Sequence, residues 1–211
     1  AINIRGNVIY AVNNADLNII NSNFVDNSPS SKYGSNRNTD VCYGGAIYID
    51  GAIVDVSNST FINNQVTSKY GVNYGGVFYV TNGGQLTINH SSFINNSASK
   101  IEGTYGPKGG VIYATGANSN IIINDSSFTN NIAESNDDVA SVAGAIFLDY
   151  NVKLQLTNSN FTDSVASQDG GAIFIAGTYT GNITDCNFIN NTAGAGGAIY
   201  AGANANGLLN V

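Results

Sequence analysis

The sequence has no methionine, no tryptophan and only two prolines. Charged residues make up 10% of the chain, against roughly 25% in an ordinary globular protein, so most of its polarity must come from uncharged side chains. Asn, Ser and Thr supply that polarity. Hydrophobic residues still reach 43%, which argues against disorder. Together with abundant glycine, this composition suits a stacked β-structure with many tight turns.

Positive charge is also scarce. Seven basic residues face fourteen acidic ones, for a net charge of −7, so nucleic acid is not expected as a partner. No stretch approaches the ~18–20 apolar residues of a membrane span. The sequence opens without Met and without a signal peptide. We therefore expect a fragment of a longer, processed protein, which contacts a membrane only through a region outside this fragment.

A glycine-led signature recurs along the whole chain. It is clearest as Gly44-Gly45-Ala46-Ile47-Tyr48, and its copies begin at residues 6, 44, 75, 109, 143, 170 and 196. Each of the first six copies is followed by a Phe with an Asn or Ser three residues later, as in Phe61 and Asn64. The interval from glycine to Phe is nearly constant, and the spare length falls after that Asn. Such a repeat is typical of a solenoid with long loops at one corner.

Each repeat predicts three short strands. One follows the glycines (46–49), one alternates apolar and polar residues (54–56), and one ends on the Phe (59–61). Successive repeats would pair in parallel and extend long sheets. The sequence therefore predicts an all-β fold, a single parallel β-helix domain over residues 1–211 with about six to seven rungs. Connections between parallel strands are generally right-handed, and this favours a right-handed coil.

Stacked rungs place like side chains above one another. We expect an inward Phe column, an Asn column that closes the turn after the third strand, and a Ser column two residues before each Phe. Cys186 takes the last place in that Ser column, as a small core residue. Cys42 lies several rungs away, on the order of 20 Å at ~4.8 Å per rung, so no disulfide between the two is expected.

The combined G-G-A-I and F-x-x-N repeats resemble the passenger domains of chlamydial polymorphic membrane proteins. The S-x-F-x-N-N motif and the Asn-rich composition look still closer to those of the adhesin-like surface proteins of methanogenic archaea. The resemblance covers nearly the whole chain. It implies a secreted parallel β-helix, displayed at the cell surface and used in attachment, and it carries over no catalytic residues.

The long loops contain the candidate ligand-binding residues. Because these loops follow the same corner, their aromatic side chains should project from one edge and suit recognition of sugars or protein surfaces. The alternative is that each Tyr packs its loop against the wall of the helix. The candidates are Tyr33, Tyr43, Tyr70, Tyr74 and Tyr105.

An outward aromatic column is a second candidate. If Ile47 points inward, Tyr48 points outward, and the equivalent positions in other rungs are also Tyr or Phe. Such a ladder could stack on carbohydrate, or the long loops could fold over and cover it. Its members are Tyr10, Tyr48, Tyr79, Tyr113, Phe147, Phe174 and Tyr200.

Catalytic groups do not converge in the sequence. The acidic residues are scattered over different strands and turns, whereas glycoside hydrolysis usually needs two carboxylates in one cleft. His90, the only histidine, occupies a turn position, where a surface role is more common than a catalytic one. Glu134, Asp137 and Asp138 could hold calcium, although a solvated loop is the simpler interpretation. No catalytic residue, metal or cofactor is therefore predicted.

These observations favour an extracellular, non-enzymatic adhesin module at a cell surface. Its expected partner is a host or neighbouring-cell surface protein or glycan, bound through the loops and a face of the β-helix. Two alternatives stay open: a polysaccharide-degrading lyase or glycoside hydrolase on the same scaffold, and a passive stalk that spaces a distal binding head.

Overall fold

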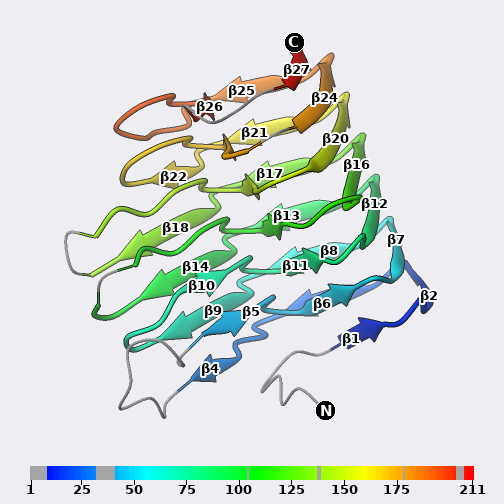
Figure 1. Ribbon diagram of the computed structural model, residues 1–211, viewed down its shortest axis with the longest axis horizontal. Coiled ribbons are helices and arrows are strands. Elements are labelled where there is room, and N and C mark those ends of the chain that lie inside the picture. Colours follow the sequence, from blue (N-terminus) through cyan, green and yellow to red (C-terminus); the bar gives the residue numbers. More distant parts are fainter. Residues whose placement is uncertain (1–8, 32–40, 104, 137–138, 178, 203–206) are drawn as a thin grey trace.

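The computed structural model describes residues 9–31, 41–103, 105–136, 139–177, 179–202 and 207–211. These residues form a parallel β-solenoid whose coils stack from the N-terminal to the C-terminal end (Figure 1). Among them there is no helix, and hence none long and apolar enough to cross a membrane. The all-β parallel fold predicted from the repeats is confirmed.

The first sheet begins at the glycine pairs and contains seven parallel strands. Inward positions such as Ile47 and Phe78 are fully buried, and each pairs with its counterpart one rung away. The strands are β1 (Ile9–Val12), β6 (Ile47–Asp50), β11 (Phe78–Thr81), β15 (Ile112–Ala114), β19 (Ile146–Leu148), β23 (Ile173–Ile175) and β26 (Ile199–Ala201).

The second sheet also has seven strands, and its alternating pattern buries every other residue. These strands are β2 (Asp16–Ile20), β7 (Ile53–Ser57), β12 (Gln85–Asn89), β16 (Asn120–Asn124), β20 (Val152–Thr157), β24 (Tyr179–Thr184) and β27 (Gly207–Asn210). The third sheet, with six strands, carries the Phe column. Its strands are β3 (Asn23–Val25), β8 (Thr60–Ile62), β13 (Ser92–Ile94), β17 (Ser127–Thr129), β21 (Asn160–Thr162) and β25 (Asn187–Ile189).

A fourth sheet, which the sequence did not predict, follows the third one. Its five parallel strands are β4 (Ser30–Ser31), β9 (Gln65–Ser68), β14 (Ser97–Lys100), β18 (Ile132–Ser135) and β22 (Val165–Ala166). Of these, β9, β14, β18 and β22 each bury one small or aliphatic hydrophobic residue, such as Val66 or Ala98. A single buried hydrophobic residue is too weak a pattern to predict a strand, so the sequence places these residues in the loops. Beyond it, β5 (Cys42–Tyr43) and β10 (Asn73–Tyr74) form a further parallel pair.

The predicted Phe column is present. The rings of successive rungs stack with centroids 4.5 to 5.1 Å apart and interplanar angles of 6 to 14°. Burying each such ring contributes roughly 1.5–3 kcal/mol. The column contains Phe24, Phe61, Phe93, Phe128, Phe161 and Phe188.

The predicted Asn column is a hydrogen-bonded ladder. Asn96 Oδ1 accepts from the backbone N–H of Asn64 at 2.9 Å and from its Nδ2 at 3.0 Å, and Asn131 does the same for Asn96. The amide of Asn96 also donates to the backbone oxygen of Phe61. Ser164 interrupts this ladder, because its buried Oγ has no hydrogen-bond partner. The Asn residues are therefore structural groups that close the turn after the Phe.

The Ser column is a second ladder, between the second and third sheets. The Oγ atoms of Ser91 and Ser126 each accept the backbone N–H of the serine one rung earlier at 3.1 Å. Each hydroxyl also donates to the carbonyl two residues before it. Cys186 takes the same place, with its thiol donating to the Thr184 carbonyl, and it packs partly buried against the core. Cys42 and Cys186 are not joined in a disulfide, as expected.

Candidate functional site

The loop edge lies where the chain returns from the fourth sheet to the glycine pairs, along one side of the solenoid (Figure 1). The loops differ in length, but their last residues align in parallel bridges that join Tyr74 to Lys108 and Lys108 to Val142. The long loops therefore share one corner, as the repeat spacing predicted. We use "loop edge" for residues 41–43, 69–74, 101–108 and 136–142, as far as they are described.

Two of the candidate tyrosines lie over the outward face of the first sheet. The rings of Tyr43 and Tyr74 stack on each other with centroids 5.6 Å apart. Tyr43 meets the Tyr79 ring edge-on at 4.6 Å, and the centroids of Tyr74 and Tyr113 are 4.4 Å apart. Both candidates are thus half-buried by packing on the wall. Their role in ligand binding stays a prediction, and Tyr33 lies outside the described residues.

The outward aromatic column is a continuous stack with centroid separations of 4.9 to 5.4 Å. The loops cover its middle, so that only 7% of Tyr48, 5% of Tyr113 and 2% of Phe147 is exposed. Tyr10, in the first rung, is 43% exposed. Over the middle rungs the loops therefore cover this column, which is the second of the two alternatives that the sequence left open.

Covering this column changes the acid–base chemistry of the phenols. Burial raises the pKa of Tyr74 to about 12, and it also raises the pKa of Tyr48, Tyr79 and Tyr113. The Tyr113 hydroxyl donates to Asp149 Oδ2 at 2.6 Å. These phenols are therefore neutral packing groups at ordinary pH.

Lys108 also packs its loop against the outward aromatic column. Its Nζ lies 4.9 Å from the centroid of the Phe147 ring, a cation–π distance. Burial lowers the pKa of Lys108, and the negative charge of Asp149 acts in the opposite direction. This lysine fastens the loop to the aromatic wall.

One exposed part of the loop edge is a ridge formed by two adjacent loops. The backbone N–H groups of Ile101 and Glu102 donate to the carbonyls of Ser68 and Lys69, at 3.2 and 2.8 Å. Lys69 Nζ lies 4.7 Å from the Tyr70 ring centroid and 4.0 Å from Glu102 Oε1. We call this surface the loop ridge, and it consists of Lys69, Tyr70, Ile101, Glu102 and Tyr105.

Two apolar side chains stand out from the loop ridge. Tyr105 is 59% exposed and Ile101 is 45% exposed. Lys100 lies beneath them, only 1% exposed, and its Nζ donates to the Tyr105 carbonyl at 2.6 Å. The sequence pointed to Tyr70 and Tyr105 but not to Ile101, nor to Lys100 as the anchor. Lys100 ends β14, a strand that the repeat pattern does not predict.

A hollow opens at the loop edge where the loops become shorter. Its volume is about 530 Å³, and Ser135, Val139, Gln168 and Asp169 are among its lining residues. Burial raises the pKa of Asp169. The neighbouring acidic loop was the calcium candidate. Glu134 is exposed on β18, whereas Asp137 and Asp138 lie outside the described residues.

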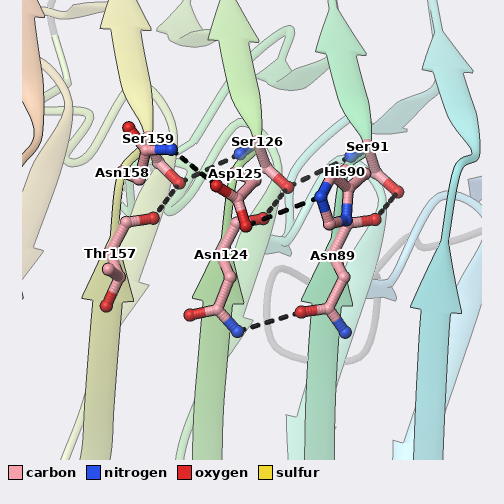
Figure 2. Close-up of polar contacts among 9 residues, drawn as sticks. All are labelled: Asn89, His90, Ser91, Asn124, Asp125, Ser126, Thr157, Asn158 and Ser159. Carbon is pink, nitrogen blue, oxygen red and sulfur yellow. Dashed lines mark hydrogen bonds and ion pairs between the residues drawn. The ribbon is translucent and has the colours of Figure 1, made fainter.

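The corner between the second and third sheets carries His90. One residue per rung turns this corner in the left-handed conformation, including His90 at φ 49°, Asp125 at φ 50° and Asn158 at φ 48°. Figure 2 shows these side chains beside the serine ladder. His90 Nε2 lies 3.7 Å from Asp125 Oδ2, and the His90 side chain is 63% exposed. The expectation of a surface turn histidine is confirmed.

Groups of three or more His, Cys, Asp or Glu side chains that could hold a metal ion do not occur in the described part of the chain.

One family model matches two segments of the chain. The model of the chlamydial polymorphic membrane protein repeat matches residues 90–115 and 185–202. The first segment runs from the His90 corner to the glycine signature of the next rung, and the second covers the same part of a later rung. No curated protein and no solved structure matches the chain. The similarity to chlamydial repeats is therefore supported, and together with the solenoid it fits a surface-exposed passenger domain. The likeness to archaeal adhesin-like proteins stays a resemblance of motifs.

Proposed function

We propose that this protein is an extracellular adhesin module, displayed at a cell surface, that binds a surface protein or glycan of a neighbouring or host cell through its loop edge. It acts by binding and catalyses no reaction. The observation that carries the proposal is the loop ridge, where Tyr105 and Ile101 project from one loop whose backbone is hydrogen-bonded to the loop of the preceding rung. The repeat match supports display at the surface.

The physical case rests on preorganisation. Interfaces draw most of their binding energy from a few aromatic and aliphatic anchors, and anchors held rigid before binding lose little entropy when they bind. The buried Lys100 ammonium holds the carbonyl of Tyr105, so the loop carrying the exposed ring is fastened to the solenoid. The Lys69–Glu102 pair places one charge of each sign beside the apolar pair. A protein surface with an apolar pocket and a polar rim suits this arrangement.

A cell-binding assay with a matched pair of variants tests the proposal. Residues 1–211 are immobilised on beads and screened against a panel of whole cells and glycans. We expect Tyr105→Ala to weaken capture of the bound cell by about tenfold or more, as for a typical anchor residue. Tyr150→Ala serves as control, because Tyr150 is 58% exposed but lies between β19 and β20, away from the loop edge.

The outcomes separate the three functions. Equal capture by both variants and the unaltered protein would place binding elsewhere on the molecule. Failure to bind any cell or glycan would favour a passive stalk. Release of sugar products from a polysaccharide panel would favour an enzyme on the same scaffold.

A further inference from the structure

The corner between the second and third sheets has a shallow polar groove that the loop edge hypothesis does not use. The groove has a volume of about 350 Å³ and crosses three rungs, from Ser92 through Ser127 to Asn160. His90 and Asp125 border it, with side chains 63% and 39% exposed. We infer that this groove binds a neutral, linear polysaccharide whose chain lies along the solenoid axis.

Asp125 supplies acceptors on the middle rung of the groove's border (Figure 2). Its Oδ1 accepts from Asn158 Nδ2 at 2.5 Å. Its Oδ2 lies 3.7 Å from His90 Nε2, which is longer than a direct hydrogen bond. Because an ionised carboxylate offers about four lone-pair sites, Asp125 can still accept hydroxyl protons from a ligand.

The neighbouring column on the third sheet supplies donors. Ser92 Oγ accepts from the hydroxyl of Ser127 at 3.2 Å and so keeps its own proton to donate. Asn160 Oδ1 accepts from Asn187 Nδ2 at 2.9 Å, which directs the amide protons of Asn160 to other partners. Sugar hydroxyls both donate and accept. A surface with acceptors and donors side by side is therefore complementary to them.

The spacing of the groups selects the shape of the ligand. Parallel strands lie ~4.8 Å apart, so the polar groups recur at that interval along the axis. An extended β-1,4-linked glycan advances by a similar length per sugar, which lets successive sugars meet successive rungs. A coiled α-1,4-linked glycan cannot follow a straight groove. The Asp125 carboxylate and the net charge of −7 disfavour an anionic chain.

The first test is a titration of the isotope-labelled protein with cellohexaose, followed through its backbone amide NMR signals. We expect shifts concentrated at residues 90–92, 125–127 and 158–160. Maltohexaose, which coils, should bind weaker by about tenfold or more. Shifts at the loop edge, no shifts with cellohexaose, or equal binding of the two hexasaccharides would each overturn the inference.

The second test removes the carboxylate without straining the corner. Glycine adopts the left-handed conformation freely, so Asp125→Gly should keep the turn and weaken cellohexaose binding by about tenfold. Asn130→Gly is the matched control, because Asn130 is an exposed left-handed residue, φ 58°, at the other end of the third sheet. Unchanged affinity of Asp125→Gly contradicts the inference. If thermal unfolding shows that this variant is misfolded, Ser92→Ala replaces it, with an expected loss of a few-fold.

Discussion

The strands of the fourth sheet begin and end in very different ways. Before β14, the turn is closed by Asn96, whose amide group repeats the contacts of Asn64 and Asn131 in the neighbouring rungs. After β14, the chain enters a loop whose length differs from rung to rung, anchored by the single buried Lys100. One end is built from the same Asn bond in most rungs, with Ser164 as an exception, and the other from side chains that occur once. Variation in length is therefore concentrated at the loop edge.

The largest expected effect on stability comes from adding a side chain to Gly76, where the loop returns to the coil. A Cβ on Gly76 would lie 2.0 Å from the Gly110 carbonyl oxygen and 2.6 Å from that of Ser97, and neither backbone group can move alone. We expect Gly76→Ala to lower the free energy of unfolding by about 3 kcal/mol or more. Chemical denaturation followed by circular dichroism measures the loss.

The equivalent glycine of the last rung is the control for this prediction. Among the described residues, a Cβ on Gly197 would meet just the Asn191 carbonyl oxygen, at 3.1 Å. Gly197→Ala should therefore cost no more than about 1 kcal/mol. If the two variants are equally stable, close packing between rungs is not what requires glycine here.

The packing of the loop tyrosines on the outward aromatic column should lose stability at alkaline pH. The pKa of Tyr74 is raised to about 12 in the folded protein, above its ordinary value of 10.0, so the folded state holds this proton more tightly than the unfolded state. The resulting stability is fully present below about pH 10 and is lost as the pH rises through about 12. Tyr74→Phe should reduce that loss by on the order of 1–2 kcal/mol, allowing for solvent screening.

Unfolding curves between pH 9 and pH 12, with phenolate absorbance as a second probe, measure this effect. Tyr150→Phe is the control, because Tyr150 is 58% exposed and lies outside the cover. An identical alkaline loss in Tyr74→Phe and in the unaltered protein would show that the cover is not held by the neutral phenol.

The smallest expected effect is a gain in stability, obtained by placing an Asn at position 164 so that the Asn ladder continues there. The buried Oγ of Ser164 has no partner, whereas Asn at the same position in other rungs bonds both to the next rung and to a Phe carbonyl. Ser164→Asn should therefore raise stability by about 1 kcal/mol. Thermal unfolding measures the gain, and Ser159→Asn is the control, because the Ser159 hydroxyl is already bonded at 2.9 Å. A lower melting temperature for Ser164→Asn would mean that this turn cannot hold an amide.

Much of the coil was predictable because equivalent positions meet one rung apart. Phe61 stacks on Phe93, and Asn64 bonds to Asn96, so a repeat in the sequence maps directly onto contacts in space. The fourth sheet escaped prediction because strands such as 97–100 carry no hydrophobic alternation. The polar groove beside Asp125 escaped it for another reason. Its groups occupy equivalent positions of successive rungs, but the repeat pattern does not show that the side chains at this corner leave an exposed hollow between them.

The amino-acid sequence by itself determined the solenoid, its inward columns and the corner at which the loops leave. These depend only on which residue types recur at which spacing. Only the tertiary structure decided which tyrosines lie against the wall and which stand out, that Lys100 anchors the loop ridge, and that a polar groove follows the corner at Asp125. The first two arrangements depend on how far each loop reaches, and the groove depends on how much space the corner side chains leave between them. The spacing of the repeats sets neither of these.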